Sequence, residues 1–269
     1  MPNNKLAWRA GRFWWDTPRA PQSIAADKYP LRALVFDLDA LADIECAGYR
    51  RVFNAAFAAH GLDISWSEVR YRRLLTLSDE RQRVVAELRA HSLCTESDVL
   101  LNLLADEIQS TKEMVLEEMI LDTDIAPRAG LIDLVTDAFT AGVSTGVVST
   151  GQRRWVEPLV RHLVGDGLVE VLVTADDLAR PTMATDNYQL VLADLGIAAK
   201  NALAITGSAA GLRAAAAAGM ATMVVGTDPE GIRGAAEVRA DYDGDQPVHI
   251  ADCQRLLECW WAGRNPSAA

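Results

Sequence analysis

Two carboxylates, Asp37 and Asp39, stand two residues apart in the stretch LVFDLDALADIE, at the end of the mostly apolar run 31–36. An ionised carboxylate can attack an electrophile or move a proton, and two neighbouring ones can divide these tasks. Aspartate also stabilises turns through its side-chain oxygens. The pair alone is therefore compatible with a catalytic turn or with a purely structural one.

Polar residues also follow three later strand-like runs, which lie at 143–148, 169–174 and 202–206. The first run is followed by Ser149, the second by Asp176, Asp177 and, a little later, Arg180, and the third by Gly207 and Ser208. Hydroxyls, carboxylates and a guanidinium at such places can bind an anion or a metal ion. These side chains can form a binding site only if the fold brings the ends of these runs together.

The elements that must position these residues alternate between helix and strand after Pro127. Helices are expected near 130–141, 153–164, 185–195 and 208–218, with strands between them and a further strand at 221–226. This alternation implies right-handed crossovers and a parallel sheet covered on both faces. Residues 45–125 instead carry apolar residues at three- and four-residue spacing, which indicates helices throughout.

The predicted fold is α/β, a doubly wound parallel sheet with a helical cap inserted after its first strand. We predict an N-terminal arm at 1–30, an α/β core at 31–46 and 126–255, a helical cap at 47–125 and a C-terminal tail at 256–269. Ligands bind beyond the carboxyl ends of the strands in such sheets. The polar residues that follow the runs are therefore expected to meet at one edge.

The order of these motifs resembles the haloacid dehalogenase superfamily, in particular its β-phosphoglucomutase-like phosphatase branch, over residues 31 to about 230. The family pattern has Asp-x-Asp after strand one, Ser or Thr after strand two, and Lys-Pro or Arg-Pro before the next helix. An acidic pair followed by a Ser- and Ala-rich helix comes after strand four. FDLD, VVST, RP and GSAAGLRAAAAAGM match this pattern in order, which implies a Rossmann-like core with a helical cap.

The resemblance implies a hydrolase that forms an aspartyl-phosphate. Asp37 would be the nucleophile, and Asp39 would protonate the leaving oxygen and then activate water. Ser149 and Arg180 would hold the phosphate oxygens, while Mg²⁺ at Asp37 and Asp39 would offset the repulsion between phosphate and aspartates. Structural roles remain open for two of these residues, because Ser149 could cap the following helix and Arg180 could be a surface charge.

The chain departs from the family pattern in two loops. The Gly-Thr pair that follows Asp-x-Asp in the family is reduced to Ala40, so we expect the loop that carries Asp39 to point differently. The cap loop that is rich in glycine in the family is TLSDERQR at 76–83, which predicts a helix start. Both changes fall at positions that bear on chemistry or substrate binding.

A third departure concerns the metal. The acidic pair expected after strand four is Thr206–Gly207, so the third ligand position is Gly207 and carries no carboxylate. Mg²⁺ prefers an octahedral set of oxygens that includes one or two carboxylates, so we expect weak binding. Asp176 and Asp177, after a neighbouring strand, are the candidates to replace the missing pair.

The amino-acid composition limits the classes of partner and site that the protein is expected to have. The 269 residues contain 26 Lys plus Arg and 37 Asp plus Glu, a net charge of -11, which opposes binding to nucleic acid or to an anionic membrane. The four cysteines are widely spaced, so neither a zinc site nor a disulfide framework is indicated. No secretory signal and no run of about 18 apolar residues is present, so we expect a cytoplasmic protein.

Three functional hypotheses follow. The first is a phosphatase that acts on a small phosphorylated metabolite. The second is a catalytically degenerate member of the family that binds a ligand or a protein partner, through the tryptophan-rich arm or the C-terminal CWWAG. The third is hydrolysis at carbon, which also uses an aspartate nucleophile but needs no metal.

Overall fold

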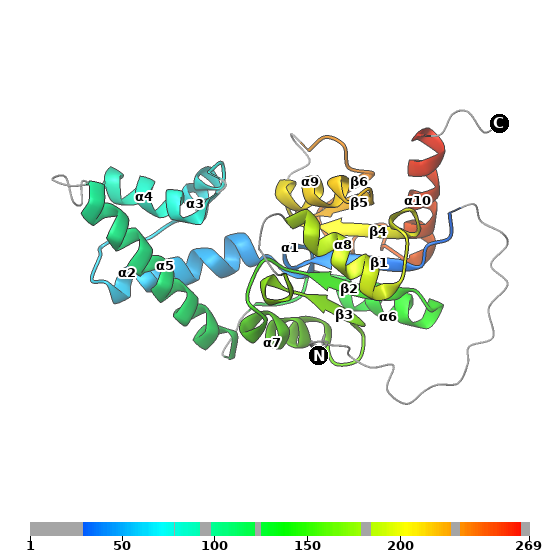
Figure 1. Ribbon diagram of the computed structural model, residues 1–269, viewed down its shortest axis with the longest axis horizontal. Coiled ribbons are helices and arrows are strands. Elements are labelled where there is room, and N and C mark those ends of the chain that lie inside the picture. The colour runs from blue at the N-terminus through cyan, green and yellow to red at the C-terminus, as the bar shows by residue number, and fades with distance from the viewer. Residues whose placement is uncertain are drawn as a thin grey trace, which may run out of the picture. The chain divides into compact units, whose positions relative to one another are not determined.

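The computed structural model describes residues 29–77, 79–91, 98–121, 125–178, 184–226 and 232–264 (Figure 1). The chain divides into two compact units. An α/β unit consists of the residues up to Asp43 and those from Ala126 onward, and a helical unit spans Ile44–Ile125. No helix in the described ranges is long and apolar enough to cross a membrane.

The α/β unit contains a six-stranded sheet with the order β3-β2-β1-β4-β5-β6, and every pair of neighbours is parallel. The strands are β1 (Ala33–Asp37), β2 (Ser144–Val148), β3 (Val171–Val173), β4 (Ala202–Thr206), β5 (Ala221–Val225) and β6 (Glu237–Arg239). The predicted doubly wound α/β fold is confirmed. Asp37 pairs in register with Val148, so the ends of β1 and β2 lie at one edge of the sheet, beside the end of β4.

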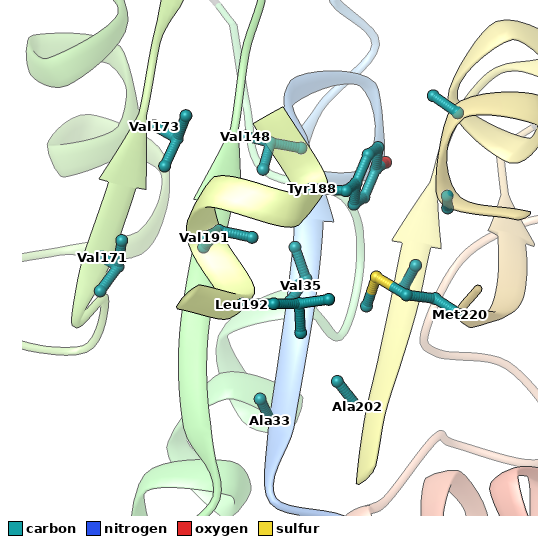
Figure 2. Packing of buried hydrophobic residues seen from close by; sticks show 13 residues of the cluster. Ala33, Val35, Val148, Val171, Val173, Tyr188, Val191, Leu192, Ala202 and Met220 are labelled. Carbon is teal, nitrogen blue, oxygen red and sulfur yellow. The ribbon is translucent and has the colours of Figure 1, made fainter. Parts of the chain in front are cut away.

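Helices cover both faces of this sheet. They are α6 (Leu131–Ala141), α7 (Arg153–Val164), α8 (Ala184–Leu195), α9 (Ala209–Ala217) and α10 (Ile250–Arg264). Helix α8 packs on α9, β2 and β3, whereas α6 packs on α7 and α10. Figure 2 shows Tyr188, Val191 and Leu192 of α8 lying over Val35 and Val148 of the central strands. These strands are mostly apolar because both of their faces are buried.

The helical unit contains a π-helix (Ile44–Tyr49), α2 (Arg50–Ala59), α3 (Glu68–Leu74), α4 (Glu80–Ala90) and α5 (Asp98–Leu121). Its centre is the fully buried Trp66. The helix start predicted at 76–83 is confirmed, because Asp79 caps α4 by accepting a hydrogen bond from the Arg81 amide at 2.9 Å. Ser78, in the same predicted start, lies outside the described residues.

Two elements differ from the prediction. Strand β6 was not predicted, because its three residues, EVR, carry only one apolar side chain. Helix α10 runs through the predicted boundary between core and tail at residue 255. Its buried positions, Cys253 and Leu257, are four residues apart and hold the helix on the core.

Two of the four cysteines can be described as free thiols. Cys253 is buried and Cys259 is exposed, and neither forms a disulfide. Burial raises the pKa of the Cys253 thiol to about 12, so this thiol stays protonated and unreactive at neutral pH. The side chain of Cys46 and all of Cys94 lie outside the described residues.

Candidate active site

Asp37 ends β1 and caps the short helix α1 (Leu38–Leu41). Its Oδ1 accepts hydrogen bonds from the Ala40 amide at 2.9 Å and from the Gly207 amide at 3.1 Å. Its Oδ2 accepts a hydrogen bond from the Thr206 hydroxyl. The carboxylate is therefore fixed by donors from two neighbouring strand ends, as a nucleophile that must attack in line requires.

The electrostatic surroundings of Asp37 act in opposite directions. Burial raises the pKa of the Asp37 carboxyl, and this effect prevails over the hydrogen bonds from Thr206, Gly207 and Ala40 and the positive charge of Arg128, which all lower it. Asp37 therefore holds its proton to a higher pH than an exposed aspartate does.

Three contacts hold the turn that carries Asp39. The Asp39 carbonyl accepts a hydrogen bond from Nε of Arg128 at 2.8 Å, and the Leu41 carbonyl accepts one from the Arg128 amide at 2.8 Å. The Ala40 carbonyl accepts a hydrogen bond from the buried hydroxyl of Tyr242 at 2.7 Å. The shortened loop thus forms one helical turn whose terminal carbonyls are bound by residues from distant segments.

Ser149 follows β2 but does not cap a helix. Its Oγ accepts a hydrogen bond from the Gly151 amide at 2.9 Å, and its carbonyl accepts one from Nδ2 of Asn187 at 2.7 Å. The N-cap of α7 is Gln152, so the predicted capping role of Ser149 is wrong. Three residues, 150–152, lie between Ser149 and the first residue of α7, which places the helix start beyond the reach of Ser149.

Two polar groups of α8 are buried close to this edge of the sheet. Within the described ranges, Oδ1 of Asn187 has no hydrogen-bond partner of acceptable geometry. The hydroxyl of Tyr188 lies beside that of Thr206 but does not form a hydrogen bond of good geometry with it. Burial, together with the negative charges of Asp37 and Asp39, raises the pKa of Tyr188 well above its ordinary value, and the Thr206 hydroxyl opposes this only in part. Tyr188 therefore keeps its proton and remains a hydrogen-bond donor.

Asp176 and Asp177, the candidates to replace the acidic pair that is missing at 206–207, already bind other residues. Asp177 Oδ2 accepts hydrogen bonds from the amide and the hydroxyl of Thr174, both at 2.8 Å, and forms an ion pair with Arg153 at 2.6 Å. Asp176 accepts a hydrogen bond from the Arg153 amide at 2.6 Å. Both acids tie the end of β3 to α7, and the idea that they compensate for the lost ligands is wrong.

The residues present do not fit the Mg²⁺ site that the resemblance implies. A Cβ at position 207 would lie 2.5 Å from the carbonyl carbon and oxygen of Asp39, so this position admits no ligating side chain. In the part of the chain that the structure describes, no three His, Cys, Asp or Glu side chains are grouped to hold a metal ion. Arg180, the predicted phosphate-binding cation, lies outside the described residues.

Motifs at strand ends led to Asp37, Asp39, Ser149 and the 206–207 pair, whereas Arg128, Tyr242, Asn187 and Tyr188 were missed. Arg128 lies next to Pro127, where the chain returns from the helical unit to the sheet, and this position was the only sequence signal for it. Tyr188 and Asn187 lie early in α8, soon after the Arg-Pro motif.

Gly211 gives a direct test of how tightly the site is packed. Alanine in a helix normally stabilises it by up to about 1 kcal/mol relative to glycine. A Cβ at Gly211 would overlap the Thr206 hydroxyl and Oδ2 of Asp37, so Gly211→Ala is expected to lower the free energy of unfolding by about 1–3 kcal/mol. In α10, Gly263→Ala meets no atom within 4 Å and serves as the control. Chemical denaturation compares the two, and a stabilising Gly211→Ala would contradict the packing.

The chain is similar to known proteins in both sequence and fold. A family model described as haloacid dehalogenase-like hydrolase matches residues 31–219. Protein CbbY of Cereibacter sphaeroides is 33% identical over 198 residues, 72% of this chain and 84% of that protein. The crystal structure of CbbY from Rhodobacter sphaeroides with phosphate is 31% identical, with a TM-score of 0.60, and covers 77% of this chain and 93% of that one. A mutant of the same protein with xylulose-(1,5)bisphosphate is 30% identical, covers the same shares, and has a TM-score of 0.61. The chain therefore belongs to the haloacid dehalogenase-like hydrolases.

Proposed function

We propose that this protein is a phosphatase-type hydrolase that acts on a small phosphorylated metabolite, in particular a sugar phosphate, with Asp37 as nucleophile. The observation that carries the proposal is the fixed carboxylate of Asp37 at the end of the central strand β1. Oδ1 accepts two hydrogen bonds, whereas Oδ2 accepts one from the described residues and keeps a lone pair for attack. The ligands of the CbbY structures, phosphate and xylulose bisphosphate, support this substrate class.

The reaction has two displacements at phosphorus. In the first, Oδ2 of Asp37 forms a bond to phosphorus, the bond to the leaving oxygen breaks, and Asp39 gives this oxygen its proton. In the second, Asp39 takes a proton from water, the water oxygen attacks phosphorus, and the bond to Asp37 breaks to release phosphate. We expect the hydroxyls of Ser149 and Tyr188 to donate hydrogen bonds to the phosphate oxygens.

A second candidate is a protein that binds a phosphorylated ligand without turnover. Two observations favour it, namely the raised pKa of Asp37 and the absence of room for a ligating side chain at position 207. A protonated carboxyl is a poor nucleophile, so turnover requires that phosphate binding leave Asp37 ionised.

Phosphate release from p-nitrophenyl phosphate and from xylulose 1,5-bisphosphate tests the proposal. We expect the sugar bisphosphate to be turned over at about 1 s⁻¹ or faster, and the aryl phosphate more slowly. Release no faster than in buffer alone, for both compounds and with or without added Mg²⁺, would overturn the proposal. Saturable binding of phosphate by such an inactive protein would then support the second candidate.

A further inference from the structure

Arg128 lies beside the turn that carries Asp39 and is held there at two points. Its amide donates to the Leu41 carbonyl and its Nε to the Asp39 carbonyl, both at 2.8 Å. The residue is only partly buried. Within the described part of the chain, neither of its terminal nitrogens, Nη1 and Nη2, has a hydrogen-bond partner. The guanidinium is thus fixed by one nitrogen and keeps two nitrogens for a ligand.

The space for this guanidinium is built by the end of β5. Gly226 follows the strand with a φ of 82°, a left-handed conformation that glycine adopts readily. A Cβ at Gly226 would overlap Cζ and Nη1 of Arg128. The amide of Gly226 donates a hydrogen bond to the Arg239 carbonyl at 2.9 Å, which fixes this turn. Only glycine leaves room for the guanidinium here, so the position of Arg128 is specified by the fold.

Arg128 and the missing metal ligand converge on one atom. The Asp39 carbonyl oxygen, which binds Nε of Arg128, is also 2.5 Å from the point where a Cβ at position 207 would lie. A divalent cation at this place would be repelled by the guanidinium. The positive charge of Arg128 also acts on Asp37, whose carboxyl pKa it helps to lower.

We propose that Arg128 is the fixed counter-charge of this site, in place of a divalent cation, so that the site binds a phosphate anion without Mg²⁺. A guanidinium with two available N–H groups matches the geometry of phosphate oxygens. The proposal rests on the proposed function only in that it takes phosphate as the ligand chemistry.

Two variants separate the charge of Arg128 from its role in holding the turn. Arg128→Lys keeps a positive charge and a donor for the Asp39 carbonyl. Arg128→Gln keeps a donor for the same carbonyl but removes the charge. A residue that only holds the turn would therefore be replaced about equally well by either side chain, whereas a counter-charge would be replaced by lysine alone.

The experiment is calorimetric titration with inorganic phosphate, in a chelator and again with Mg²⁺. We expect the wild-type protein to bind phosphate with a dissociation constant that changes less than about twofold between the two buffers. Arg128→Gln should bind about tenfold or more weakly, and Arg128→Lys within about fivefold of wild type. Arg213→Gln, which removes an exposed charge from α9, should bind as the wild type does. Thermal unfolding of each variant verifies that it is folded.

Phosphate binding that requires Mg²⁺, or that is unchanged in folded Arg128→Gln, would overturn the inference. The wild-type titration in chelator decides the metal question even if a variant fails to fold. The two proposals fail separately. Metal-free phosphate binding without any hydrolysis refutes the proposed function alone, and hydrolysis that strictly depends on Mg²⁺ refutes the role of Arg128 alone.

Discussion

Asp37→Asn is expected to lower the rate of phosphate release by about 1000-fold or more, because it removes the nucleophile. Asparagine has the shape of aspartate and preserves the local structure. Its Oδ1 can accept the hydrogen bonds from the Ala40 and Gly207 amides, and its Nδ2 can donate to the Thr206 hydroxyl. A loss of activity in this variant therefore reports on the chemistry of the carboxylate rather than on a damaged loop.

The same substitution is expected to stabilise the protein at neutral pH. The pKa of Asp37 is raised in the folded state, so the folded protein binds this proton more tightly than the unfolded chain does. The free energy of unfolding therefore falls as the pH rises from the ordinary aspartate pKa to the raised pKa of Asp37. Above the raised pKa it falls no further on account of this group. An asparagine side chain has no proton to lose in this range, so the variant's advantage over the wild type is greatest at neutral pH and vanishes below the ordinary aspartate pKa.

Steady-state kinetics and thermal unfolding over the acidic to neutral range measure both effects. The control is Asp39→Asn, which removes the acid-base group from the same turn and is expected to slow release by about 100-fold or more. Residual activity of Asp37→Asn close to that of the wild type would contradict the assignment of the nucleophile. A difference in stability between Asp37→Asn and the wild type that stays constant with pH would contradict the raised pKa.

Much of the α/β unit could be predicted because β1 to β5 are buried on both faces and therefore form short, mostly apolar runs. The predicted strand at 202–206 and helix at 153–164 coincide with β4 and α7. Strand β6 was not predicted because it lies at the edge of the sheet, where a strand can carry charged residues at both of its ends. Helix α10 was not predicted because it buries only two hydrophobic side chains, those of Cys253 and Leu257.

The residues of the candidate site likewise include some that the sequence predicted and some that it did not. Strand ends of a parallel sheet meet at one edge, so a local pattern was enough to find Asp37, Ser149 and Thr206. The contacts that hold the Asp39 turn have no local signal, because Arg128 and Tyr242 stand 89 and 202 positions away from the residues whose carbonyls they bind. Sequence also placed a missing ligand at position 207 but could not show that backbone fills the space beside it.

Trp66→Ala is expected to destabilise the helical unit, Ile44–Ile125, by about 3–5 kcal/mol. Trp66 is fully buried, and its ring centroid lies 4.9 Å from those of Phe53 and Phe57 and 5.3 Å from that of Tyr71. Alanine would leave a cavity among three aromatic rings that no neighbouring side chain can fill without leaving its own contacts.

The backbone at Trp66 is fixed independently of its ring, so the segment cannot easily collapse into the cavity. Asn54 accepts a hydrogen bond from the Trp66 amide at 2.7 Å and donates one to its carbonyl at 3.1 Å. Trp66→Phe is the matched control. It retains an aromatic ring and removes an indole N–H that has no partner among the described residues, so it should cost less than half as much.

Amide hydrogen exchange shows which of the two units loses stability in Trp66→Ala. Because the helical unit has its own core, Trp66→Ala should speed amide exchange in α2 and α3 by about 100-fold or more and leave that of β1 and β2 close to the wild-type rate. Equal acceleration in both units would show that they unfold as one, and Trp66 would then contribute to the stability of the sheet that carries Asp37. Unchanged exchange in α2 and α3 would instead mean that the aromatic cluster does not hold the helical unit together.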